Sequence, residues 1–135
     1  MDAPLDRYIR LADGLRDTTP RPDRQAAAFA AVALVHADGV DGELIAATRS
    51  RFEALKAALG GFQAPNGAMR WVYAAMLAAR QVEVSHFIGA RHALRQARAA
   101  SKTGALHAGG SRAALILSLG DASPGIVDAF YAMKR

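Results

Sequence analysis

The sequence predicts an all-α protein of about seven helices, stacked as antiparallel hairpins in an α-solenoid-like array or a compact bundle. Alanine, the strongest helix former, supplies 32 of the 135 residues. No segment alternates between polar and apolar residues with the period of two that a half-buried strand requires. A repeat of 39 residues is the third observation, and it indicates that the helices come in pairs.

The repeat places Leu55, Leu94 and Met133 at equivalent positions, and a basic residue follows each of them. Three alanine-rich apolar runs recur with them, at 31–34, 75–78 and 114–117. A period near 40 residues with two helices per period is typical of helical-repeat proteins, whose units bury their apolar faces against one another. Alanine runs match by chance, but the Leu/Met–basic pairs do not depend on alanine. We therefore expect one domain, 1–135, built from a half unit and three hairpins (4–16; 22–60, 67–102, 110–135).

The first helix is expected at 4–16, because Pro4 suits a first helical turn. Its apolar residues recur at helical spacing and predict one buried stripe (Leu5, Tyr8, Ile9, Ala12, Leu15). Pro20 and Pro22 then force extended backbone, and an alanine-rich helix is expected at 22–37.

The remaining helices are separated by glycine, proline and asparagine. Gly60-Gly61 ends the helix at 43–59, because glycine accepts the left-handed conformation of a helix C-terminus. Turn residues near 65–67 and 121–125, and a glycine pair at 109–110, separate the others, which are expected at 67–80, 84–102, 111–119 and 124–134. Large side chains should fill the gaps between the alanine-rich helices (Phe29, Trp71, Tyr73, Phe87, Phe130, Tyr131).

Positive charge is concentrated in the second half of the chain. Residues 67–135 hold nine Arg/Lys and three Asp/Glu, whereas residues 1–66 hold eight and nine. On the helix at 84–102 four cations recur at steps of four, three and four, which places them on one face (Arg91, Arg95, Arg98, Lys102). This basic stripe could neutralise nucleic-acid phosphates or meet an acidic protein. A solvated helix face, or a compositional preference for arginine, explains the same residues.

Metal binding has one weak candidate, the Gly/Asp-rich stretch 36–43. Asp38, Asp41 and Glu43 could offer oxygen ligands to a hard cation. Calcium loops of the EF-hand type need acids at positions one, three, five and twelve, and this stretch has them at one, four and six. Capping of the following helix by Asp41 or its neighbours is the preferred interpretation.

Signals for an enzyme are weaker still. The chain has no cysteine, no G-x-S-x-G segment and no phosphate-binding loop ending in GK[ST]. Gly109 to Arg112 open a predicted helix, where free amides could bind an anion next to Ser111 and Arg112; a plain N-cap accounts for them equally. No catalytic residue and no cofactor are therefore expected.

Two families resemble parts of this chain. Residues 129–134, with Phe130/Tyr131 before Met133-Lys134, resemble a hairpin ending in an uncharacterised bacterial family of all-helical proteins; the likeness extends over about 24–135 and implies a helical fold without a known activity. Ala37-Asp38-Gly39 followed by Glu43 is similar to the tellurite-resistance TerB-like domains, over about 28–55. There the glutamate comes about two residues later, which puts a carried-over metal role in doubt.

We expect a non-enzymatic interaction or scaffold module that binds another protein. The alternatives are a polyanion or nucleic-acid binder that uses the basic stripe, and a TerB-like metal- or stress-associated domain. A homo-oligomer is also possible on this sequence. No membrane partner is expected, because the longest apolar run, 26–37, is about half of a membrane span. The N-terminus has acids and no apolar core, unlike a signal peptide, so the expected location is the cytoplasm.

Overall fold

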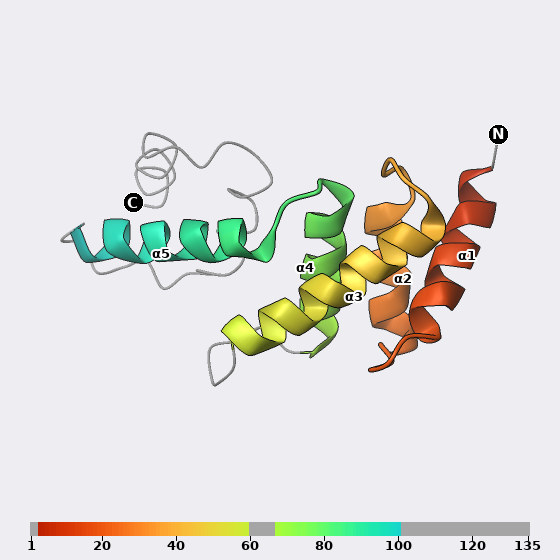
Figure 1. Ribbon diagram of the computed structural model, residues 1–135, viewed down its shortest axis with the longest axis horizontal. Helices are drawn as coiled ribbons and strands as arrows, with labels where there is room; N and C mark the ends of the chain where they lie inside the picture. The colour runs from red at the N-terminus through yellow and green to blue at the C-terminus, as the bar shows by residue number, and fades with distance from the viewer. Residues whose placement is uncertain (1–2, 60–66, 101–135) are drawn as a thin grey trace. The chain divides into compact units, whose positions relative to one another are not determined.

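The computed structural model describes residues 3–59 and 67–100, with side chains up to residue 96, and this part of the chain is helical without strands (Figure 1). It contains α1 (Pro4–Arg16), α2 (Arg24–Leu34), α3 (Asp41–Ala58), α4 (Gly67–Ala79) and α5 (Val84–Ala100). The all-α class is thus confirmed, and each helix begins and ends within one turn of its predicted bounds. The helices expected at 111–119 and 124–134 lie outside the described residues, so the number seven stays a prediction.

The contacts divide the chain into two compact units, Met1–Glu83 and Val84–Arg135. The first contains α1 to α4, and the second contains α5. The single domain with its hairpin units stays a prediction, and so does the repeat. Leu55 and Leu94 are both buried, as the repeat requires, but its third position, Met133, lies outside the described residues.

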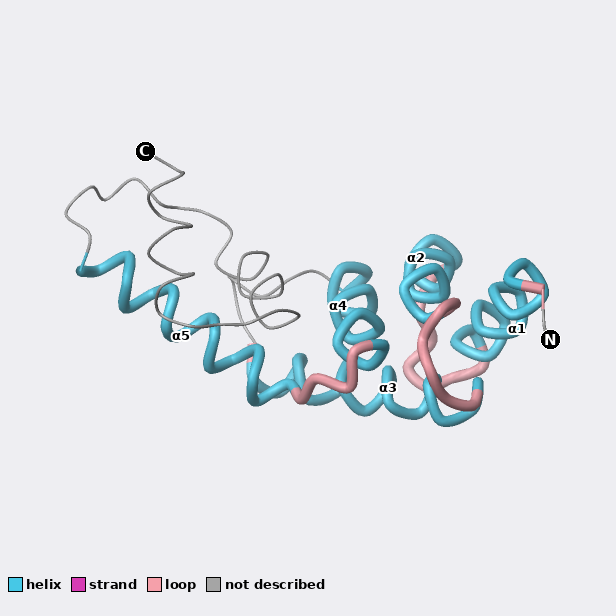
Figure 2. Tube along the Cα trace, turned by 90° about the horizontal axis from the view of Figure 1, so that it is seen from above, coloured by secondary structure: helices cyan, strands magenta, loops and turns pink. Residues whose placement is uncertain are grey.

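In the first unit α2 packs between α1 and α4, while α3 packs against α4 and α1. Figure 2 shows α1, α2 and α4 nearly end-on in a row, with α3 running beneath them. The buried side of α2 is mostly alanine, and small side chains allow helix axes to approach closely (Ala26, Ala27, Ala30, Ala31, Leu34). The main neighbours of α2 are thus α1 and α4.

The core is formed where these helices meet. Phe52 of α3 stacks on Trp71 of α4 with ring centroids 4.1 Å apart. Leu44, Thr48, Phe52 and Leu55 recur along the buried side of α3, and the Thr48 hydroxyl donates a hydrogen bond to the carbonyl of Leu44 at 2.8 Å. Trp71, Tyr73 and Phe87 are buried as expected; Phe130 and Tyr131 lie outside the described residues.

The stripe expected on α1 was right in part, and the expectation for Phe29 was wrong. Leu15 is buried as expected, together with Leu11, whereas Leu5 and Ile9 are 65% and 47% exposed. The packing of α1 against α2 and α3 selects the side of the helix that contains Leu11 and Leu15. Phe29 is 57% exposed because the alanines of α2 fill the inner side of that helix.

The connection from α1 to α2 reverses the chain and thereby positions the candidate site. Arg16 donates to the carbonyl of Pro22 at 3.0 Å, and Asp23 caps α2 by accepting from the amide of Ala26 at 2.7 Å. The beginning of α1 consequently lies beside the end of α2. Among the described residues, no helix combines the length and the apolar character that crossing a membrane requires.

The buried position of Leu55 leads to a stability prediction. Truncation of this side chain, which is 0% exposed, should lower the free energy of unfolding by about 2–5 kcal/mol because it leaves a cavity between α3 and its neighbours. Urea denaturation can be followed by the fluorescence of Trp71, the single tryptophan. Leu5→Ala is the control and should change stability by less than about 0.5 kcal/mol; equal losses in the two variants would contradict this packing.

Candidate functional site

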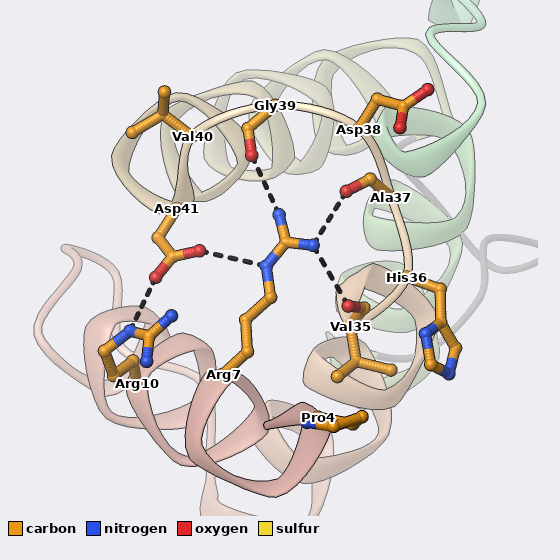
Figure 3. A pocket seen from close by; sticks show the side chains of 10 residues that line it. All are labelled: Pro4, Arg7, Arg10, Val35, His36, Ala37, Asp38, Gly39, Val40 and Asp41. Atoms are coloured by element: carbon orange, nitrogen blue, oxygen red, sulfur yellow. Dashed lines mark hydrogen bonds and ion pairs between the residues drawn. The ribbon is translucent and has the colours of Figure 1, made fainter. Parts of the chain in front are cut away.

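An open pocket of about 870 Å³ lies between the first turns of α1 and the segment that joins α2 to α3 (Figure 3). Its lining is both polar and apolar, and it includes two arginines and two aspartates (Pro4, Arg7, Arg10, Val35, His36, Ala37, Asp38, Gly39, Val40, Asp41). All of these residues belong to the first unit, and the joining segment, 35–40, supplies most of them. The centre of the pocket is therefore set by how α1 meets this segment.

The Arg7 guanidinium occupies that centre and binds four oxygen atoms from the joining segment and the start of α3. Its Nη1 donates to the carbonyls of Val35 at 3.0 Å and Ala37 at 2.8 Å, and its Nη2 donates to the carbonyl of Gly39 at 2.8 Å. Its Nε donates to Asp41 Oδ1 at 3.1 Å. The planar fork of N–H donors on arginine suits such a set of acceptors. The bonds span 28 to 34 positions of sequence, and they clamp α1 onto the segment. We call this set of bonds the Arg7 clamp.

The backbone of the joining segment is shaped to present those carbonyls. Carbonyls at the end of a helix lack partners within the helix, and Val35 follows the last residue of α2. Gly39 has a φ of +123°, a conformation that side-chain-bearing residues rarely adopt. A Cβ at this position would make only an ordinary contact with Leu44, so the glycine is required for its conformation rather than for space.

Asp41 joins the clamp to a second arginine. Arg10 Nε donates to Asp41 Oδ2 at 2.8 Å, so that each carboxylate oxygen accepts from a different guanidinium. The hydrogen bond from Arg10 lowers the pKa of Asp41; burial opposes this, and the hydrogen bond from Arg7 adds to the lowering. Asp41 is therefore a carboxylate in the folded protein at neutral pH.

The structure separates the three carboxylates that were candidate metal ligands. Asp41 is held by the two arginines, Asp38 is exposed and points away from Arg7, and Glu43 is exposed in the first turn of α3 (Figure 3). Within the described ranges, no three His, Cys, Asp or Glu side chains come together as a metal-binding group. The expectation that Asp41 or its neighbours cap α3 through a side chain was wrong, because Val40 is the N-cap residue and no side chain caps the helix.

The basic stripe lies in the second unit, and the structure describes two of its side chains. Arg91 is half-buried and Arg95 is exposed, one turn apart on α5. Burial lowers the pKa of Arg91, and the positive charge of Arg95 lowers it further. Arg98 belongs to α5, but its side chain lies outside the described part. Lys102, Ser111 and Arg112 also lie outside it.

The sequence did not single out Arg7 and Arg10, which make the most contacts in this pocket. Their spacing of three residues places both on neighbouring parts of one helix surface. Nothing local indicates that their partners lie about thirty residues further along the chain. The glycine and aspartate residues of the stretch 36–43 did indicate this segment, but as a candidate metal site and not as the partner of two arginines.

Comparison with known proteins found no matching family model, no matching curated protein and no matching solved structure. Both family resemblances therefore stay expectations. The pocket has the geometry of a structural clamp, because the hydrogen bonds of the Arg7 guanidinium end on the protein's own oxygen atoms.

Replacement of Arg7 tests the clamp. Arg7→Met keeps much of the aliphatic stem but removes the Arg7 donor from three carbonyls and leaves Asp41 with Arg10 alone, and we expect a loss of roughly 2–3 kcal/mol in the free energy of unfolding. Arg10→Met is the matched control. It removes a side chain that is 43% exposed, and such ion pairs contribute less than about 1 kcal/mol. A loss no larger for Arg7→Met than for Arg10→Met, measured in urea, would show that the clamp is dispensable.

The lowered pKa of Asp41 predicts a specific dependence on pH. Because the folded state favours the charged carboxylate, its contribution to stability is fully present above the ordinary aspartate pKa of about 3.9 and disappears as pH falls through the lowered value. The difference in free energy of unfolding between wild type and Asp41→Asn should be constant from about pH 7 to pH 5 and shrink below about pH 4. A difference that grows on acidification contradicts the assignment.

Proposed function

We propose that the first unit is a non-enzymatic interaction module that binds an acidic amphipathic helix of another protein. The observation that carries this proposal is the exposure of four large apolar side chains on neighbouring helices. Leu5 and Ile9 on α1 are 65% and 47% exposed, and Phe29 and Val32 on α2 are 57% and 59% exposed. We call these four residues the α1–α2 apolar surface.

The positions of these residues on their helices support a joint surface. Phe29 and Val32 are three residues apart, on the side of α2 opposite its buried alanines. Leu5 and Ile9 are four residues apart and therefore one turn apart on α1. The two helices pack against each other, side by side in Figures 1 and 2. Clustered exposed apolar residues mark binding sites more often than single ones do.

Exposed apolar side chains on two packed helices suit a third helix. Such a partner helix presents apolar residues at i, i+3, i+4 and i+7. The Arg7 clamp and the packing of α1 on α2 hold the two helices together in the free protein, so little conformational freedom is lost on binding. This is the physical advantage of a surface that is rigid before the partner arrives.

The net charge of the whole chain, +5, favours an acidic partner over a second copy. All of this charge belongs to residues 84–135, because residues 1–83 contain ten Arg/Lys and ten Asp/Glu. It attracts an acidic helix to the chain at long range, and it makes two copies repel each other. A TerB-like metal- or stress-associated role remains the alternative for the joining segment. A rise in melting temperature on adding Ca²⁺ or Mg²⁺, absent in Asp38→Asn/Asp41→Asn, would favour that alternative.

Synthetic helices test the proposal directly. Two peptides with the same apolar face, one with an acidic and one with a basic polar face, are titrated with the full chain by fluorescence anisotropy. The acidic peptide should bind more tightly, and Phe29→Ser/Val32→Ser should weaken it at least about tenfold, or 1.4 kcal/mol. Val40→Ser is the control, because Val40 is 65% exposed but lies outside the surface.

Three results would overturn the proposal. The first is that neither peptide binds. The second is that Phe29→Ser/Val32→Ser and the control Val40→Ser weaken binding equally. The third is a concentration-dependent dimer of the free chain that Phe29→Ser/Val32→Ser abolishes, because it would make a second copy the occupant.

A further inference from the structure

Arg51 of α3 holds the segment that follows α4, as Arg7 of α1 holds the segment that follows α2. Its Nε donates to the carbonyl of Val82 at 2.8 Å and its Nη2 to Glu83 Oε1 at 3.3 Å, while its Nη1 donates to the carbonyl of Ala47 in its own helix at 3.3 Å. The Arg51 side chain is only 12% exposed. We call its bonds to Val82 and Glu83 the Arg51 clamp.

The two clamps occupy equivalent positions in two pairs of helices, α1–α2 and α3–α4. Arg7 and Arg51 are 44 positions apart. At the same spacing, buried residues of the first pair correspond to buried residues of the second (Leu11 and Leu55, Leu15 and Leu59, Ala30 and Ala74, Ala31 and Ala75). Each arginine also binds a carboxylate at the beginning of the next helix, Asp41 in the first residue of α3 and Glu83 immediately before α5.

The backbone that the Arg51 clamp holds is strained. Gln81 follows shortly after the end of α4 and has a φ of +57°, in the left-handed region that favours glycine. The amides of Gln81 and Val82 donate back to the carbonyls of Ala78 at 3.1 Å and Leu77 at 2.9 Å, which are the hydrogen bonds of a Schellman helix ending. Strained backbone persists only where its surroundings hold it, and Arg51 binds the next carbonyl along the chain.

We propose that the Arg51 clamp is a latch on residues 80–83, and that α1–α2 and α3–α4 are two copies of one helix pair in which an arginine of the first helix secures the segment after the second. While the latch is closed, Arg51 keeps Gln81 in its strained conformation; once its bonds break, relief of that strain favours the open segment. Because the first unit ends at Glu83, the latch decides whether the link to the second unit is fixed or flexible. The proposal does not depend on the function proposed for the α1–α2 apolar surface.

Of the two clamps, the Arg51 clamp is the one that should open more readily. Arg7 binds three carbonyls and one carboxylate of its segment, whereas Arg51 binds one carbonyl and one carboxylate. The Glu83 side chain is 76% exposed, so water and salt screen this ion pair. A weak latch on a strained segment allows residues 80–83 to open while the helices stay folded.

Amide hydrogen exchange of the full chain tests the latch. In Arg51→Met, exchange at Gln81 and Val82 should accelerate by more than about tenfold, whereas exchange at Ala37, in the segment that Arg7 holds, should change by less than about twofold. Gln81→Gly should slow exchange at Val82, because glycine adopts the left-handed conformation without strain. Faster exchange at Val82 in Gln81→Gly would contradict the strain.

Arg49→Met is the matched control, because Arg49 lies on the same helix but donates to the carbonyl of Thr19 at 2.7 Å. It should leave exchange at Val82 unchanged. If Arg51→Met does not fold, Arg51→Lys replaces it; this variant keeps the charge but loses the fork of donors, and it should also accelerate exchange at Val82. The proposal is overturned if exchange accelerates equally at Val82 and Ala37, if it accelerates at neither, or if the control has the same effect.

Discussion

A single guanidinium group, that of Arg7, joins the beginning of α1 to the segment between α2 and α3. Three carbonyls and one carboxylate accept hydrogen bonds from it, and the carboxylate also accepts one from Arg10. The segment has little regular structure of its own, so the side chain of another helix holds it in place. Through Asp41 the same group reaches the first residue of α3, so one side chain joins α1 to the end of α2 and the beginning of α3.

The alanine side of α2 explains why this small unit has an apolar exterior. With alanines facing inward, α2 fits between α1 and α4, and its larger residues, Phe29 and Val32, face outward. The clamp and the packing of α1 on α2 hold the two helices that carry these exposed apolar residues together. The residues of the first unit have zero net charge, whereas those of the second carry the excess positive charge.

The sequence was informative about helices and much less so about which sides they bury. Prolines at 20 and 22 and the glycines after α3 delimit segments with clear helical periodicity, and these helices were predicted within one turn. The apolar stripe predicted on α1 contained Leu15, which is buried, but also Leu5 and Ile9, which are exposed, because the packing partners of α1 decide which side of the helix is buried. The pairing of Arg7 with Asp41 spans 34 positions, and a single sequence contains no signal for such a contact. The uneven charge was visible from the start, but its division into zero and +5 required the boundary after Glu83.

Amide hydrogen exchange tests most directly whether the Arg7 clamp fixes this part of the fold. The amide of Ala37 donates to Leu34 and that of Leu44 donates to Val40, on either side of the clamped carbonyls, while the amide of Leu59 donates to Leu55 at the far end of α3. In Arg7→Met, exchange at Ala37 and Leu44 should accelerate by more than tenfold relative to exchange at Leu59, because local opening no longer breaks the bonds to Arg7. Equal changes at all three amides, or no change at Ala37 and Leu44, would contradict the central role given to Arg7.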